Sequence, residues 1–253
     1  MPASTEGRPR LLILGGTTEA ALLAKRLVAE GRWDVVTSLA GATRRRRALA
    51  GEVRTGGFGG TEGLVDYLEA ARIARVIDAT HPYAAMISRH AAAACARLGL
   101  PALRLQRPPW QRQSGDRWIE VADTKEAAKV LPGLAKRAFL SIGRREIAAF
   151  TGLPEVWFLV RLIEAPDEPL GLATYELLLA RGPFEVASER ALLDRNRIAA
   201  VVAKNSGGDA TYAKIEAARE AAVPVVMIAR PEAPEGIATA AGVEDVLAWL
   251  AGA

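Results

Sequence analysis

Short apolar segments alternate with helix-like segments along the whole chain, and no other feature limits the fold as strongly. In the first half, five segments have the composition of strands: residues 10–16, 34–40, 51–57, 75–80 and 101–106. Segments with the apolar spacing of helices follow three of them, at residues 18–30, 61–71 and 84–98. This order is typical of a parallel sheet with helices on both faces, so we predict an α/β, doubly wound fold.

A segment rich in proline and polar residues, 107–116, interrupts this pattern and is predicted to be a linker. The alternation then resumes, with strands expected within residues 117–121, 138–143, 156–163, 198–207 and 223–231 and a final helix at 243–252. We therefore predict two doubly wound halves, residues 1–110 and 111–253. The pattern also permits a terminal strand of one half to complete the sheet of the other.

The sequence argues against a membrane-spanning helix, a secretory signal and a structural zinc site. No apolar segment approaches the roughly 20 residues that a membrane-spanning helix needs, and the start "MPASTEGRPR" lacks the apolar core of a secretory signal. One cysteine and two histidines are too few for a structural zinc site. Cys95 lies in an alanine-rich helical segment and is expected to be a buried core residue. We expect a cytoplasmic protein without a metal or a membrane partner.

The net charge of +4 raises the question of a polyanionic partner. The aromatic residues do not interleave with the basic ones, and no predicted helix carries a basic stripe, so we expect no nucleic-acid partner. The arginines lie near predicted turns, which suits a small polyanionic ligand. We expect a monomer, with a weak homodimer as the alternative.

Ligands of open parallel sheets bind beyond the carboxyl ends of the strands, so the residues that follow each predicted strand are candidates. The first strand is followed by Gly15, Gly16, Thr17 and Thr18. The glycines allow a tight turn, and the next helix presents backbone N–H groups to a phosphate. The full Gly-x-Gly-x-x-Gly pattern is missing, so a plain tight turn is the alternative.

The second predicted strand has no acidic residue at its carboxyl end, where a fold that prefers NADH places one beside the ribose. Thr37 and Ser38 offer hydroxyls there, and an arginine run at 44–47 follows. An arginine such as Arg44 accommodates the 2′-phosphate of NADPH, so this pattern favours NADPH. A solvated charge run is the alternative.

Two further segments of the first half are candidates. In the glycine-rich loop 55–60, Gly56 and Gly57 allow close approach to a flat ligand and Phe58 can pack on a ring; a mobile surface loop is the alternative. In "DATHPYA", Asp78 lies near the end of the fourth strand, and His81 and Tyr83 flank Pro82. His81 can orient a cofactor or substrate or transfer a proton, and a structural histidine is the alternative.

The second half has cations at its strand ends. Arg144 and Arg145 follow one strand and can bind carboxylates, and Arg230 follows the last one. Another strand ends in a second glycine turn, composed of Lys204, Asn205, Ser206, Gly207, Gly208 and Asp209. The lysine precedes the glycines, so this is not a P-loop. Together these residues indicate an anion site, although each cation alone can be a surface residue.

These segments resemble, in their order and spacing, the precorrin-6A reductases of cobalamin biosynthesis. The resemblance covers nearly the whole chain and is carried by "LGGTTEA", "GGFGG", "DATHPYA", "IGRRE", "GPF", "KNSGGDATYAKIEAARE" and "PVVMIARP". It implies that NADPH reduces a double bond of the tetrapyrrole precorrin-6A, with a hydride to one carbon and a proton to its neighbour, to give precorrin-6B. It also implies two Rossmann-like domains, the first for NADPH and the second for the substrate, with the ligands in the cleft between them.

The resemblance also implies which candidate residues contact the cofactor and which contact the substrate. It implies a cofactor side with Gly15, Gly16, Thr17, Thr18, Thr37, Ser38, Gly56, Gly57 and Phe58, to which we add Arg44. It implies a substrate side with Arg144, Lys204, Asn205, Ser206, Gly207, Gly208, Asp209 and Arg230. His81 and Tyr83 fall between the two sides, with His81 also a cofactor contact. The proton donor stays open among Lys204, His81, Tyr83, Asp209 and a bound water, with Lys204 ranked first.

Three alternatives remain at this stage. A short-chain dehydrogenase would need a Tyr-x-x-x-Lys pair, but Ile87 and Glu216 stand where Tyr83 and Tyr212 would require lysine. A non-enzymatic NADPH-sensing module would not need the basic strand ends of the second half. The sequence also leaves open whether the macrocycle carries cobalt; we favour the metal-free substrate.

Overall fold

The computed structural model describes residues 7–41 and 48–252. They divide into two compact units, one that runs to Pro108 and includes the segment from Pro231 onward, and one that comprises Pro109–Arg230. Within the described ranges, no helix is both long and apolar enough to cross a membrane. The α/β, doubly wound fold expected from the sequence is confirmed in each unit.

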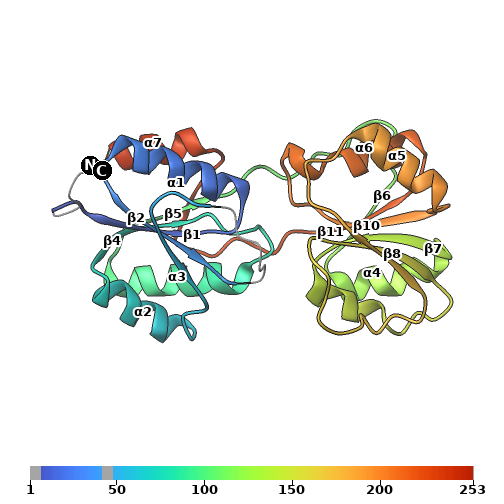
Figure 1. Ribbon diagram of the computed structural model, residues 1–253, viewed down its shortest axis with the longest axis horizontal. Helices are drawn as coiled ribbons and strands as arrows, with labels where there is room; N and C mark the ends of the chain where they lie inside the picture. Colours follow the sequence, from blue (N-terminus) through green and yellow to red (C-terminus); the bar gives the residue numbers. More distant parts are fainter. Residues whose placement is uncertain (1–6, 42–47, 253) are drawn as a thin grey trace. The chain divides into compact units, whose positions relative to one another are not determined.

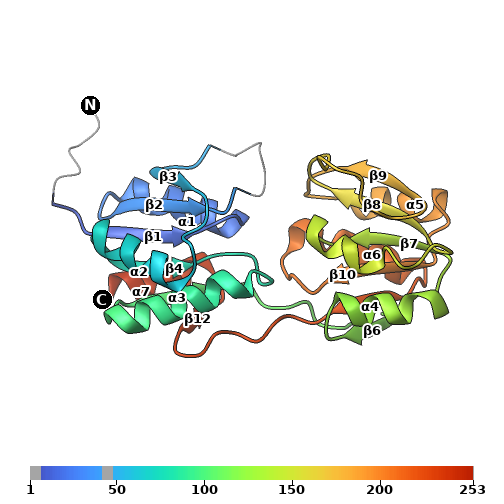
Figure 2. The ribbon, with the colours of Figure 1, turned by 90° about the horizontal axis from the view of Figure 1, so that it is seen from below.

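The described strands of the first unit form one six-stranded parallel sheet in the order β12-β5-β4-β1-β2-β3 (Figures 1 and 2). The strands are β1 (Arg10–Leu14), β2 (Asp34–Leu39), β3 (Glu52–Thr55), β4 (Ile73–Asp78), β5 (Ala102–Leu105) and β12 (Ala238–Ala240). Helices α1 (Thr18–Glu30) and α7 (Val243–Ala251) cover one face, and α2 (Thr61–Ala70) and α3 (Ala85–Leu98) cover the other. Helix α1 has the bounds predicted for it.

The last strand of this sheet comes from the far end of the chain. Ala238 pairs with Leu103 and Ala240 with Leu105, so β12 extends the sheet beyond β5. The prediction that residues 111–253 form the second half is corrected here, because the chain from Pro231 onward packs in the first unit. Strand β12 is only three residues long, and its pairing with β5 depends on tertiary contacts that no local pattern reports.

The second unit contains a separate parallel sheet in the order β6-β11-β10-β7-β8-β9 among the described residues. Its strands are β6 (Trp118–Val121), β7 (Arg137–Ser141), β8 (Trp157–Leu162), β9 (Tyr175–Leu179), β10 (Ala200–Lys204) and β11 (Val225–Ile228). Helices α5 (Val186–Arg195) and α6 (Ala213–Glu220) lie on one face and α4 (Thr124–Val130) on the other (Figure 1). The short 3₁₀ helices are η1 (Leu131–Gly133), η2 (Arg144–Phe150) and η3 (Asp209–Thr211). Strand β9 was not predicted.

The strand order identifies one edge of each sheet as a ligand position. In the first unit the order reverses between β1 and β4, and in the second between β7 and β10. Open parallel sheets bind ligands beyond the carboxyl ends of strands at such switch points. Gly15 and Ala79 follow the two strands of the first switch point, and Ile142 and Asn205 follow those of the second. The predicted motifs therefore flank both positions.

Apolar side chains on both faces of the first sheet are buried and stabilise its strands. Leu11, Leu12 and Ile13 of β1 are fully buried, as expected for a central parallel strand. Cys95 of α3 lies in the core on the face of the sheet that contains Leu12, and burial raises the pKa of its thiol to about 11. Cys95 is therefore a core residue, as predicted from its alanine-rich segment.

Candidate functional site

The turn after β1 requires its two glycines for different reasons. The Gly15 N–H donates to the Ser38 carbonyl at 2.9 Å, which extends the pairing of β1 with β2. A Cβ on Gly15 would lie 2.9 Å from Cγ2 of Thr37, so a side chain does not fit there. Gly16 has φ +115°, a conformation that other residues rarely adopt. The chain therefore turns tightly at the switch point and leads directly into α1.

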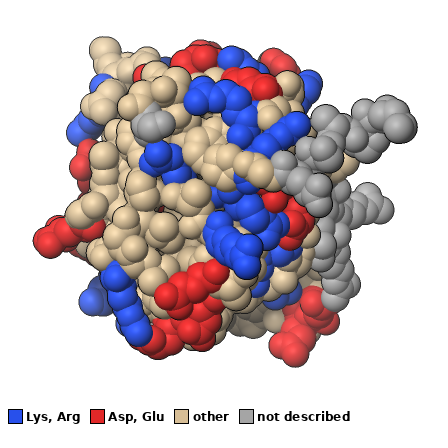
Figure 3. All heavy atoms as spheres, turned by 90° about the vertical axis from the view of Figure 1, so that its left-hand side faces the viewer, with Lys and Arg blue, Asp and Glu red and all other residues tan. Residues whose placement is uncertain are grey.

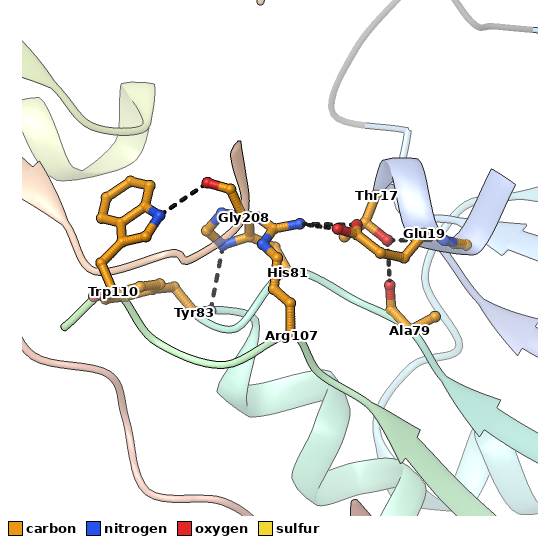
Figure 4. Close-up of polar contacts among 9 residues, drawn as sticks. Thr17, Glu19, Ala79, His81, Tyr83, Arg107, Trp110 and Gly208 are labelled. Carbon is orange, nitrogen blue, oxygen red and sulfur yellow. Dashed lines mark hydrogen bonds and ion pairs between the residues drawn. The ribbon is translucent and has the colours of Figure 1, made fainter. Parts of the chain in front are cut away.

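Thr17 caps helix α1 and joins two turns. Its Oγ1 accepts a hydrogen bond from the Ala20 N–H at 3.1 Å and donates one to the Ala79 carbonyl at 2.8 Å (Figure 4). The first N–H groups of an α-helix have no partner within the helix, and the neighbouring Gly16 and Thr18 are exposed. This arrangement suits an anion at the start of α1.

An acidic residue also lies in the first turn of α1. Arg107 donates to both carboxylate oxygens of Glu19 at 2.8 Å, and both side chains are partly exposed (Figure 4). Arg107 therefore offsets a negative charge that would otherwise oppose a phosphate at this helix end. Sequence reasoning missed this pair because 88 positions separate its members.

Thr37 and Ser38, predicted as cofactor contacts, are both buried beside the turn after β1. Thr37 is fully buried, and its Oγ1 has no hydrogen-bond partner among the described residues. Its side chain packs under Gly15, so it supports the turn instead of lining the edge. Ser38 is also buried, and its Oγ accepts a hydrogen bond from Arg54 Nη1 at 2.8 Å.

Arg54 of β3 is a candidate residue that the sequence analysis missed. Besides Ser38, its guanidinium donates to the carbonyls of Gly56 and Gly57, each at 3.1 Å. It lies 3.8 Å from the centroid of the Phe58 ring, which itself packs on Tyr67. The carbonyls of the glycine-rich loop therefore bind the half-buried guanidinium of Arg54 beside the carboxyl end of β2. Arg44 lies outside the described residues.

The "DATHPYA" turn is held by the buried carboxylate of Asp78. Its Oδ1 accepts hydrogen bonds from the Thr80 N–H at 3.1 Å and the Thr80 hydroxyl at 2.7 Å. Its Oδ2 lies 3.7 Å from Nε of Arg104, which is also buried. Asp78 is therefore a brace for the turn, not an exposed reactive group.

His81 and Tyr83 lie on that turn, immediately after β4. The Tyr83 N–H donates to Nδ1 of His81 at 3.3 Å, and the two ring centroids are 5.7 Å apart (Figure 4). His81 is exposed and Tyr83 half-buried. Their position beside β1 at the switch point is consistent with a ligand contact, and their roles remain predictions.

In the second unit, the turn after β10 is tied to its neighbours. Lys204 forms an ion pair with Glu146 of η2, and its side chain is 13% exposed. Arg230 Nε donates to the Asn205 carbonyl at 2.6 Å. Lys204, Arg230 and Asn205, predicted as substrate contacts, are therefore brought together at this switch point.

Trp110 holds the other side of this turn. The Asn205 side chain exchanges two hydrogen bonds with the main chain of Trp110, at 2.7 and 3.0 Å. The indole Nε1 donates to the Gly208 carbonyl at 2.8 Å (Figure 4). Gly207 and Gly208 have φ +67° and +73°. The side-chain amide of Asn205 therefore has a structural role, and these hydrogen bonds fix the turn to Trp110.

The remaining predicted residues are distributed around this turn. Ser206 is buried, whereas the Asp209 side chain is exposed at the start of η3. Arg144 lies at the start of η2, where its Nη1 is 3.7 Å from Asp167 and more than half of its side chain is exposed.

Basic residues are not confined to the two switch points. Figure 3 shows a band of Lys and Arg on one face of the molecule. Arg32 precedes β2 and Arg75 lies near the amino end of β4, where a cavity of about 280 Å³ is lined by Pro9, Arg32, Trp33, Ala74, Arg75 and Pro101. Arg75 lies near the rings of both Trp33 and Trp249. Net charge alone therefore does not locate the site.

The fold and the two glycine turns define a doubly wound α/β protein that is built to hold ligands at its switch points. A family model described as precorrin-6x reductase CbiJ/CobK matches residues 10–251, and the chain belongs to this family. Its members are oxidoreductases that act on a CH–CH bond of a macrocycle, so the resemblance found in the sequence is confirmed. A short-chain dehydrogenase is thereby set aside.

Individual relatives agree with this assignment. The precorrin-6A reductase of Rhodococcus erythropolis is 46% identical over 95% of this chain and 97% of its own length. A solved structure of CobK precorrin-6A reductase matches with a TM-score of 0.91 and 45% identity, over 96% of both chains. The cobalt-precorrin-6A reductase of Salmonella typhimurium is 30% identical, over 87% of each chain.

Proposed function

We propose that this chain reduces precorrin-6A to precorrin-6B with NADPH as the reductant. The observation that carries the proposal is the turn at residues 15–18, which lies at the switch point of a sheet with the strand order of dinucleotide-binding folds. Gly15 leaves no room for a side chain, since a Cβ there would lie 2.9 Å from Cγ2 of Thr37, and the exposed Gly16 leaves the start of α1 open to a pyrophosphate.

The preference for NADPH over NADH rests on the charges beside the carboxyl end of β2. The acid of this strand, Asp34, lies at its amino end and pairs with Arg10 at 2.8 Å. At the carboxyl end, Ser38 and Arg54 form a hydrogen-bonded pair. A guanidinium there suits a 2′-phosphate, whereas an acid would suit free ribose hydroxyls.

The second switch point supplies the positive charge for a substrate with many carboxylates. Lys204 is the last residue of β10, Arg230 follows the neighbouring strand β11, and Arg144 extends the positive charge to η2. In this proposal Lys204 exchanges its contact with Glu146 for a substrate carboxylate or for the charge that develops on the macrocycle.

The chemistry itself demands alignment more than covalent catalysis. NADPH, when bound, supplies the hydride for one carbon of the double bond, and a proton is added to the neighbouring carbon. Lys204 is our first candidate for stabilising the developing charge or donating that proton. His81, Tyr83, Asp209 and a bound water are the alternatives.

The decisive experiment follows NADPH absorbance with purified full-length chain in the presence and absence of precorrin-6A. We expect oxidation that requires the tetrapyrrole and is much slower with NADH. Cobalt-precorrin-6A is the matched control; faster turnover with it would replace the metal-free substrate in the proposal. If NADPH binds but is oxidised with neither precorrin-6A nor cobalt-precorrin-6A, a sensing module is favoured. If NADPH does not bind, the cofactor assignment is overturned.

A further inference from the structure

Three charged side chains are buried together near the second switch point: Arg161 of β8, Glu189 of α5 and Lys214 of α6. Their exposed fractions are 8%, 3% and 4%. Arg161 donates to both oxygens of Glu189, at 2.9 and 2.6 Å. Two cations therefore face one anion, and the cluster has an unbalanced positive charge whenever Lys214 is protonated.

Lys214 is in direct contact with the turn that follows β10. Its Nζ donates to the Thr211 carbonyl at 2.6 Å and lies 5.0 Å from the centroid of the Trp110 ring. That indole in turn donates to the Gly208 carbonyl. Lys214 is thus linked to both ends of the segment 208–211, once directly and once through Trp110.

The surroundings of Lys214 disfavour its charged form. Burial, and then the nearby Arg161, lower the pKa of Lys214 to about 7, while Glu189 acts in the opposite direction. In addition, Nε of Arg161 has no hydrogen-bond partner among the described residues, so Glu189 does not satisfy the whole guanidinium. A buried charge of this kind is costly unless an anion offsets it.

We propose that Lys214 is a positioning residue for the glycine turn at 205–211, and that a carboxylate which binds to this turn is bound together with a proton that Lys214 takes up. The inference rests on the proposed function, which brings a polycarboxylate to this turn. An anion close to the cluster favours the ammonium form, because the attraction acts through a poorly hydrated interior. By linkage, the protonated form then binds the carboxylate more tightly.

The test is isothermal titration calorimetry of the full-length chain with precorrin-6A, in buffers that differ in ionisation enthalpy. A group with a pKa of about 7 that becomes fully protonated takes up about half a proton at pH 7. We expect a larger uptake at pH 8, almost none at pH 6, and an affinity that falls as the pH rises from 7 to 9.

Two variants separate this role from a purely structural one. Lys214→Arg keeps the charge at every pH, so it should bind without proton uptake and keep its affinity at pH 9. Lys214→Met should bind more weakly at pH 6 and lose the uptake. Lys129→Met, at an exposed lysine of α4, is the matched control and should behave as the unaltered chain.

Proton uptake that persists in Lys214→Arg or Lys214→Met overturns the inference, as does binding to the unaltered chain without any uptake. Both results are compatible with tetrapyrrole-dependent NADPH oxidation and would leave the proposed function intact. Failure of that oxidation assay would instead remove the proposed function on which this inference depends.

Discussion

The hydroxyl of Thr17 donates a hydrogen bond to the carbonyl oxygen of Ala79 at 2.8 Å, and it thereby joins the turn after β1 to the turn after β4. The same oxygen caps α1 by accepting from Ala20. One side chain therefore couples the helix start to the segment that carries His81, at the point where the strand order reverses.

Thr17→Val should lower both stability and NADPH affinity, because it removes the cap and the link to Ala79 without changing side-chain volume. We expect the free energy of unfolding to fall by about 1–2 kcal/mol and the Kd for NADPH to rise several-fold. Urea denaturation and fluorescence titration measure the two effects. Thr17→Ser keeps the hydroxyl and should retain most of both; equal losses in the two variants would contradict this account.

Gly15→Ala should destabilise the first unit because its new methyl would lie 2.9 Å from Cγ2 of Thr37. Overpacking of this kind costs about 1–3 kcal/mol. Thr37→Ser removes the obstructing methyl. The double variant should therefore lose less free energy of unfolding than the two single variants lose when their losses are added. Gly57→Ala is the control, since a Cβ there meets nothing within 4 Å. Strict additivity of Gly15→Ala and Thr37→Ser in chemical denaturation would exclude the contact as the cause.

Arg54→Gln should reduce the preference for NADPH, because it removes the guanidinium held by Ser38 beside the carboxyl end of β2. We expect the KM for NADPH to rise about tenfold, equivalent to roughly 1.4 kcal/mol, with little change for NADH. Arg32→Gln, at an exposed arginine near the amino end of β2, should change neither value. A parallel loss with both cofactors would show that Arg54 only supports the loop.

Lys204→Ala should lower kcat at least tenfold, since it removes the cation at the second switch point. The Kd for NADPH should change less than twofold, because the predicted cofactor turn belongs to the other unit. Steady-state kinetics and a separate NADPH titration distinguish the two quantities. Glu146→Gln, which loses the ion-pair partner but keeps Lys204, should affect kcat less. Unchanged turnover in Lys204→Ala would remove this residue from the candidates.

Lys214→Met should stabilise the fold more at low pH than at high pH. The pKa of Lys214 is lowered from 10.5 to about 7, so the native state carries the cost of a buried ammonium below pH 7. That cost disappears as the pH rises toward 10.5, where the unfolded chain also loses the proton. We expect the variant to gain roughly 1–3 kcal/mol more at pH 6 than at pH 9, measured by urea denaturation. A gain that is the same at both values would mean that the charge of Lys214 does not limit stability.

Local patterns in the sequence were sufficient for most of the secondary structure. Strands β1 to β5 and helix α1 occur where apolar runs and helical spacing predict them, because both periodicities depend on neighbouring residues in the chain. Strands β9 and β12 were missed. Strand β12 reads "ATA", and only its pairing with β5 makes this short segment a strand.

The sequence by itself determined the fold class, the two glycine turns and the family, since these depend on the order and spacing of motifs along the chain. Only the tertiary structure decided that the chain end from Pro231 completes the first unit, that Thr37 is buried under Gly15, and that Arg54 is held by Ser38. It also brought Lys214 together with Arg161 and Glu189. These relationships join residues on different elements, and they follow from the order of the strands in the sheet, which long-range packing determines.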